Sequence, residues 1–349
     1  VGLGFDGGHF RSNVRSAGAV SVAGMAVPFL AAMLLAPWLL GVPGLFGEAL
    51  GPAQATLFLG ACISITAFPM LARILQERRV SGSPLASLAL SAGAINDAGA
   101  WIVLAVVLAT AGDGAGVAVK VIASAALFSG FLLVLGPRLL APLGRAAERQ
   151  GGVGSGLLAT AMVLFLGAAL AMDWAGMHAV LGGFVLGVVM PRGVLARDLK
   201  AKLEPFTVVL LAPIFFTFSG LNTQLSLVAE PGLLPIAVVV LAVSILAKGG
   251  ACWAAARLTG QDNPTALAIG TLMNTRGMME LIILNIGLQR GLIGPALFSI
   301  LVLMAVVTTL MTSPVFEWVY GARARARGDL GRLEDDPAEP AAAPLPNSV

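Results

Sequence analysis

Long apolar stretches alternate with short polar ones along the chain up to about residue 320. Most are close to the length of about 20 residues that a helix needs to cross a hydrocarbon core. The stretches lie at roughly 16–40, 54–75, 85–110, 114–136, 154–172, 177–190, 205–221, 232–258, 264–287 and 295–320. This pattern predicts an all-α polytopic membrane protein with about ten transmembrane helices. The two short stretches, 177–190 and 205–221, must stand nearly upright or be extended by flanking residues.

Composition supports a membrane location. Of the 349 residues, 58% are hydrophobic and 11% are charged, whereas soluble domains carry roughly 25% charged residues. The sequence has neither His and Cys residues at metal-binding spacing nor a phosphate-binding glycine loop. We therefore expect neither an enzyme nor a bound cofactor. The net charge of +3 is small and its basic residues concentrate in particular connections, which argues against a nucleic-acid partner.

Those basic residues indicate sidedness, because Lys and Arg are retained on the cytoplasmic side of a membrane. They gather in connections 1–15, 76–84, 137–153, 191–204 and 259–263 and in the residues after 320. We expect these connections and the C-terminus to face the cytoplasm from a cell inner membrane. Residues 321–349 are rich in Arg and Ala, then acidic and rich in Pro and Ala, which predicts a disordered cytoplasmic tail.

Two groups of three apolar stretches, 16–110 and 232–320, resemble each other but enter the membrane from opposite sides. Such inverted repeats are typical of secondary transporters. Polar, Gly and Pro residues interrupt the middle stretch of each group. The interruptions are Thr66-Ala67-Phe68-Pro69 and Asn274-Thr275-Arg276-Gly277. They predict two crossing broken helices, whose freed backbone groups hydrocarbon cannot satisfy but an ion site can. The alternative is that Pro69 and Gly277 are tolerated kinks.

Four charged residues fall near the middle of apolar stretches: Asp97, Lys248, Arg276 and Glu280. Each costs at least ~2.5 kcal/mol at a helix centre, so at least one is expected to be functional. Asp97 follows Asn96 at the depth of the Thr66 interruption. Desolvation favours its protonated form, whereas an alkali cation held by free carbonyls and the Thr66 hydroxyl favours the ionised form. Asp97 is therefore predicted to bind a proton or a cation in turn, with Asn96 and Thr66 completing the ion-binding site.

The other charged residues have competing interpretations. Asp97 could instead be neutralised permanently by Lys248 or Arg276. Arg276 and Glu280, spaced i and i+4, are expected to form a structural ion pair rather than to bind the cation directly. Lys248 is either a second coupling group or a stabilising partner, and its position alone does not decide between them.

Several of these motifs resemble the monovalent cation/proton antiporter-2 family, including bacterial sodium or potassium/proton exchangers similar to plant cation/proton exchangers. The motifs are Ser64-Ile-Thr-Ala-Phe-Pro69 with Leu71-Ala-Arg-Ile-Leu75, Ile95-Asn-Asp-Ala98 with Trp101, Asn274-Thr-Arg-Gly277 with Glu280-Leu-Ile-Ile-Leu-Asn285, and Ala247-Lys-Gly-Gly250. The resemblance covers residues 1–320 and implies the sodium/proton antiporter fold. It also implies Asp97 as the carrier of ion and proton.

The resemblance further implies how residues 1–320 are organised. Core helices within 16–110 and 232–320 would move against linking and dimerisation helices within 114–221, in a homodimer. Family members usually carry further helices before the position that matches residue 1, so the chain is expected to be truncated at its N-terminus. Asn96 stands where some electrogenic relatives have a second Asp, which leaves the stoichiometry open.

The sequence therefore favours exchange of Na+ or K+ for H+ by alternating access. A gated monovalent-cation efflux channel and a non-transporting membrane sensor on the same scaffold are the alternatives. A sodium/organic-solute symporter shares inverted repeats and broken helices but would not need Lys248 or Arg276 in mid-membrane. Cavity dimensions and ligand number decide between Na+ and K+, and the sequence does not show them.

Overall fold

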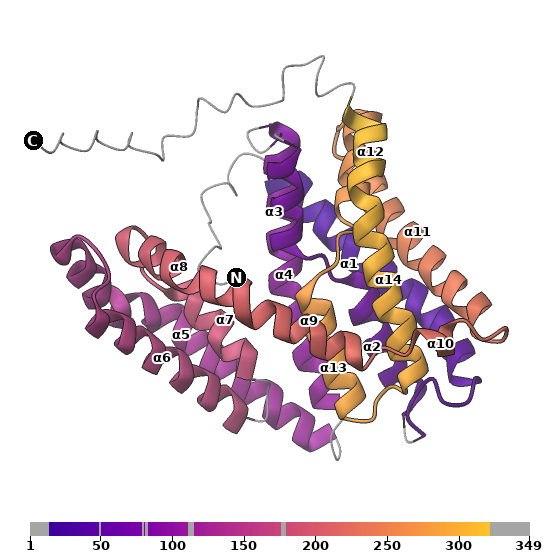
Figure 1. Ribbon diagram of the computed structural model, residues 1–349, viewed down its shortest axis with the longest axis horizontal. Coiled ribbons are helices and arrows are strands. Elements are labelled where there is room, and N and C mark those ends of the chain that lie inside the picture. Colours follow the sequence, from indigo (N-terminus) through magenta and orange to yellow (C-terminus); the bar gives the residue numbers. More distant parts are fainter. Residues whose placement is uncertain are drawn as a thin grey trace, which may run out of the picture.

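A computed structural model describes residues 14–321 except 49, 79, 81–82, 111–114 and 176–178 (Figure 1). The predicted tail after residue 321 lies outside this described part, as does the side chain of Asp97. The elements are α1 (Val14–Leu40), α2 (Pro52–Ser64), α3 (Phe68–Glu77), α4 (Pro84–Thr110), α5 (Ala115–Gln150), α6 (Ser155–Trp174), α7 (Ala179–Val189), α8 (Val194–Phe206), the π-helical turn η3 (Thr207–Leu211), α9 (Ala212–Leu221), α10 (Leu225–Val228), α11 (Leu234–Leu258), α12 (Asn263–Leu272), α13 (Met278–Gln289), α14 (Pro295–Phe316) and the π-helical turn η4 (Glu317–Gly321). The described chain is thus nearly all helical, as predicted.

Seven helices or joined helices in the described residues are long and apolar enough to cross a membrane. They are Arg15–Leu40, Pro52–Glu77, Ala126–Gln150, Ser155–Trp174, Val194–Leu221, Leu234–Leu258 and Pro295–Gly321. The apolar helices Pro84–Asn96 and Met278–Gln289 are shorter. The expected count of about ten spans therefore stays a prediction.

Two expected connections are helical instead. Helix α5 continues to Gln150, through most of the connection expected at 137–153, and α8 begins at Val194, within the connection expected at 191–204. Arg, Lys, Leu and Ala are all good helix formers, so a helix can continue after positive charge marks its exit from hydrocarbon. As a result, the short stretch 205–221 is extended by its N-terminal flank into the joined helix Val194–Leu221.

The helices form two groups (Figure 1). On one side α5 packs against α6, α7 and α8, and on the other α1 packs against α2, α4 and α11. The joined helix formed by α8, η3 and α9 connects the groups and passes close to α13, as Asn285 of α13 donates a hydrogen bond to Ser219 of α9. Burial differs sharply between these parts. In the apolar 18-residue segment of Pro52–Glu77, 67% is buried inside the structure, but in that of Val194–Leu221 only 6% is buried. The broken helix α2–α3 is thus enclosed by its neighbours, whereas the outer helices leave apolar side chains for lipid or another chain.

Candidate functional site at the crossing of two broken helices

Both predicted interruptions are breaks between helices. Helix α2 ends at Ser64 and α3 begins at Phe68, while α12 ends at Leu272 and α13 begins at Met278. Pro69 is not in the first break itself but in the first turn of α3. Its missing N–H costs nothing there, because the first N–H groups of a helix have no intrahelical partner.

The two breaks lie directly against each other. The backbone N–H of Ala67 donates to the carbonyl oxygen of Thr275 over 3.0 Å, and the Thr66 hydroxyl donates to the carbonyl oxygen of Met273 over 2.9 Å. Gly277 allows this close approach, since a Cβ added there would lie 2.8 Å from the Cβ of Ala67. Two helix ends with free carbonyls and two helix starts with free amides therefore meet at one buried point.

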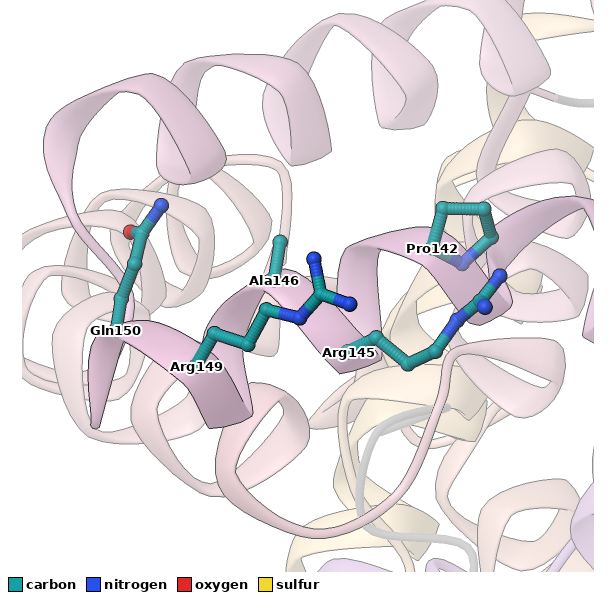
Figure 2. A pocket seen from close by; sticks show the side chains of 5 residues that line it. All are labelled: Pro142, Arg145, Ala146, Arg149 and Gln150. Atoms are coloured by element: carbon teal, nitrogen blue, oxygen red, sulfur yellow. The ribbon is translucent and has the colours of Figure 1, made fainter.

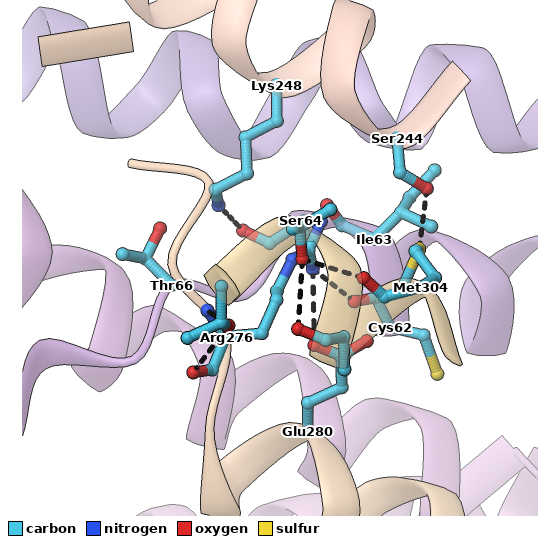
Figure 3. Close-up of polar contacts among 12 residues, drawn as sticks. Cys62, Ile63, Ser64, Thr66, Ser244, Lys248, Arg276, Glu280 and Met304 are labelled. Carbon is cyan, nitrogen blue, oxygen red and sulfur yellow. Dashed lines mark hydrogen bonds and ion pairs between the residues drawn. The ribbon is translucent and has the colours of Figure 1, made fainter. Parts of the chain in front are cut away.

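Two cations cover the C-terminal end of α2 (Figure 3). Arg276 donates from Nη1 to the carbonyl oxygen of Cys62 over 2.6 Å and from Nη2 to that of Ile63 over 2.8 Å. The Lys248 ammonium donates to the carbonyl oxygen of Ser64. Both charged side chains are fully or almost fully buried. They satisfy carbonyls that have no intrahelical partner and oppose the negative end of the helix dipole.

The equivalent end of α12 is covered by neutral groups. Asn274 Nδ2 donates to the carbonyl oxygen of Gly270 over 3.2 Å, and the Thr275 hydroxyl donates to that of Leu272 over 2.9 Å. Thr66 satisfies Met273, as described above. The two breaks thus differ in charge, because among the described residues the buried positive charge covers the end of α2 and not that of α12.

Glu280 lies in the first turn of α13, where the helix dipole favours a negative charge. Its Oε2 is 3.6 Å from Arg276 Nη1, and both side chains have 0% exposure. Neither Glu280 carboxylate oxygen has a hydrogen-bond partner among the described residues. The pair has the i, i+4 spacing seen in the sequence, but Arg276 lies in the break before α13 rather than in the helix. Arg276 therefore contacts two partners, Glu280 and the C-terminal end of α2.

Asn96 reaches the crossing from α4. Its Nδ2 donates to Thr66 Oγ1 over 3.2 Å, and its Oδ1 accepts a hydrogen bond from the Ser21 hydroxyl of α1 over 2.8 Å. The structure therefore brings Asn96, Thr66, Lys248 and the second break together. The backbone of Asp97 continues α4 directly after Asn96. The side chain of Asp97 lies outside the described part of the structure, so the role predicted for it stays a prediction.

Ser21 is not among the site residues predicted from the sequence. A signal was present, since Ser21 is a polar residue within the apolar stretch 16–40. Serine is common in membrane helices, however, and nothing near it in sequence indicates a partner 75 residues away.

A cavity of about 440 Å³ lies elsewhere, beside the last turns of α5. Pro142, Arg145, Ala146, Arg149 and Gln150 line it (Figure 2). None of these residues belongs to the crossing or to the predicted site. We therefore place the candidate functional site at the crossing because of its polar contacts, and not at this cavity.

Comparison with known proteins gives a consistent result. Residues 1–319 match the family model described as sodium/hydrogen exchanger, transmembrane. The chain is 37% identical over 270 residues to the Na+/H+ antiporter NhaS4 of Synechocystis, covering 77% of this chain and 66% of that protein. It is 32% identical over 323 residues to cation/H+ antiporter 19 of Arabidopsis thaliana, covering 92% of this chain and 40% of that protein. The chain thus spans only part of these relatives, which are named as antiporters and not as enzymes.

A solved structure has the same fold. The sodium proton antiporter MjNhaP1 from Methanocaldococcus jannaschii matches with a TM-score of 0.60 at 14% sequence identity. The match covers 95% of this chain and 82% of that chain. The sodium/proton antiporter fold that the family resemblance implies is therefore confirmed.

Proposed function

Because the chain belongs to the sodium/hydrogen exchanger family, we propose that it exchanges a monovalent cation, Na+ or K+, for H+ across a membrane. The observation that carries this proposal is the buried crossing of two broken helices, bordered by Asn96 and Thr66. Carbonyl and hydroxyl oxygens freed from helix geometry are suitable ligands for a hard alkali cation. The names of two relatives agree with this substrate class, since NhaS4 is named as an Na+/H+ antiporter and the Arabidopsis protein as a cation/H+ antiporter.

Asp97 is the proposed carrier. It directly follows Asn96 in α4, and Asn96 is hydrogen-bonded to Thr66 at the crossing. A carboxylate at this depth is neutral when it holds either a proton or a monovalent cation, and an unpaired charge there is costly. Proton and cation therefore compete for one site, with Asp97 and Thr66 as ligands of the cation. Alternating access of that site to the two sides of the membrane then couples the two fluxes.

The assembly we propose is a homodimer in a cell inner membrane, with the C-terminus in the cytoplasm. Helices within 114–221 would form the dimer, and the helices within 16–110 and 232–320 would move against them. The buried share of the apolar helices supports this division: it is 11%, 17% and 6% in Ala126–Gln150, Ser155–Trp174 and Val194–Leu221, but 28% or more in the long apolar helices within 16–110 and 232–320.

Proton movement driven by cation gradients tests the function. We expect proteoliposomes holding a pH gradient and a pH-sensitive dye to lose that gradient when Na+ or K+ is added to the side opposite the acid pool. Li+, Na+, K+ and Rb+ are scanned, with choline as the impermeant control. Cation flux without proton movement would identify a channel, and the absence of both fluxes would indicate a sensor.

The exchange is expected to be electroneutral. Asn96 is neutral and Glu280 is paired with Arg276, so Asp97 is left to carry one proton or one cation in each half-cycle. Lys248 is held by the carbonyl of Ser64, and in this proposal it is a stabilising partner and not a second proton carrier. A membrane potential, worth ~2.3 kcal/mol per charge per 100 mV, then has no net charge to act on.

The measurement imposes potentials with K+ and valinomycin and follows proton movement driven by Na+. Unchanged rates and end-point gradients support one-for-one exchange. End points that shift with voltage would contradict it and make Lys248 the second proton carrier.

A further inference from the structure

Three hydrogen bonds run in series through the crossing. The Ser21 hydroxyl donates to Asn96 Oδ1 over 2.8 Å, Asn96 Nδ2 donates to Thr66 Oγ1 over 3.2 Å, and the Thr66 hydroxyl donates to the Met273 carbonyl over 2.9 Å. Each of these residues is at most 1% exposed. The series connects α1, α4, the first break and the end of α12.

The far end of the series fixes the direction of every bond. The Met273 carbonyl can only accept, so the Thr66 hydroxyl hydrogen points to it and the Thr66 oxygen accepts from its other neighbour. That neighbour must then be the amide nitrogen of Asn96, which places Oδ1 toward α1. An amide oxygen needs a donor there, and Ser21 supplies it.

Without the Ser21 donor, Asn96 Oδ1 is a buried acceptor that has lost its partner in the series. Turning the amide over would not repair this, because the Thr66 hydroxyl would have to leave the Met273 carbonyl and Nδ2 would then face α1 without an acceptor. Within the series the amide is then held only by its 3.2 Å bond to Thr66, so the position of the Thr66 oxygen is less well fixed.

We propose that Ser21 is a positioning residue for cation binding at the crossing. Its hydroxyl holds the Asn96 amide in place, and through that amide it holds the Thr66 oxygen with one acceptor position free for the transported cation. The inference rests on the proposed cation site, and it adds a residue on α1 to that site. Ser21 does not touch the cation, so its effect depends on Thr66.

The expected effect is on cation affinity rather than on turnover. Removing one buried hydrogen bond that keeps a site preorganised is expected to raise the half-saturating cation concentration of Ser21→Ala about fivefold. The maximal exchange rate should change by less than about twofold, because the reacting groups remain. Ser21→Thr keeps the hydroxyl and should stay close to wild type. Ser21→Cys keeps the size but donates weakly, so it should be intermediate.

Binding is measured without transport, as the rise in thermal midpoint of the purified full chain in detergent during titration with NaCl or KCl, against choline chloride at equal ionic strength. Ser244→Ala is the matched control, since Ser244 is also fully buried but its hydroxyl bonds to Val240 of its own helix and to Met304 Sδ of α14, neither of which belongs to the series. The same variants are then assayed for exchange in proteoliposomes.

A higher titration midpoint for Ser21→Ala, with Ser21→Thr and Ser244→Ala near wild type, supports the inference. It further requires that Ser21→Ala has no added effect in a Thr66→Val background, where the series is already broken. The inference would be overturned if the titration midpoint of Ser21→Ala were unchanged, or if Ser244→Ala shifted it equally. It would also be overturned by a full added effect of Ser21→Ala in the Thr66→Val background, or by the absence of any cation effect on the wild type. Failure of exchange with intact cation binding would overturn the proposed function alone.

Discussion

Exchange is expected to fall to the level of protein-free vesicles when Asp97 is replaced by asparagine. Asparagine keeps the shape of the side chain but can neither carry a proton nor compensate the charge of a cation. A cation at the buried crossing would then be an uncompensated charge in low dielectric, near Lys248 and Arg276, which already bring two positive charges there. The loss should therefore be complete for every alkali cation, and should not be recovered at high cation concentration.

Membrane insertion separates this loss from misfolding. Asp97→Asn should be recovered from membranes in wild-type amount and with an unchanged elution volume in size-exclusion chromatography, because it removes a charge from the middle of an apolar stretch. Asp173→Asn, at the exposed end of α6, is the matched control and should retain exchange. Normal exchange by a well-folded Asp97→Asn protein would overturn the assignment of Asp97.

The positions of the two breaks could be predicted because they have local causes. Several polar residues together with Gly277 or Pro69 in the middle of an apolar stretch favour a break in the helix, whereas single prolines such as Pro28 do not interrupt α1. The spacing of Arg276 and Glu280 likewise predicted a pair that the structure contains, at 3.6 Å. These signals depend on a few neighbouring residues, so one sequence was enough to show them.

The partners of Arg276 could not be predicted in full. Its guanidinium also binds the carbonyls of Cys62 and Ile63, more than 200 residues away. Any residue has a backbone carbonyl, so no side-chain pattern indicates which one will lie at the end of a broken helix. Ser21 was missed because nothing near it in sequence indicates Asn96 as its partner. Helix α5 ends and α8 begins outside the apolar stretches because residues that favour helices continue past the point where the apolar pattern stops.

The second large effect is expected on stability. Arg276→Met leaves Glu280 as a buried charge with no cation within ion-pair distance among the described residues, and breaking a buried pair in this way costs about 3 to 5 kcal/mol. It also leaves the Cys62 and Ile63 carbonyls without their donors, at about 1 to 3 kcal/mol for each group left unsatisfied. We expect a large loss of folded protein, measured as the monodisperse peak in fluorescence-detected size-exclusion chromatography.

A double substitution separates these two contributions. Arg276→Met with Glu280→Met removes both charges, so the double variant should recover a substantial part of the lost yield and thermal midpoint, but not all of it, because the end of α2 is still uncovered. Arg73 and Glu77 provide a matched pair with the same i, i+4 spacing, 2.8 Å apart and 70% and 56% exposed. Changing Arg73 to Met should cost less than about 1 kcal/mol, since exposed ion pairs contribute little. If the Arg276/Glu280 double variant is no better than Arg276→Met, the two residues do not form a structural pair. Full recovery would instead show that the bonds from Arg276 to α2 contribute nothing to stability.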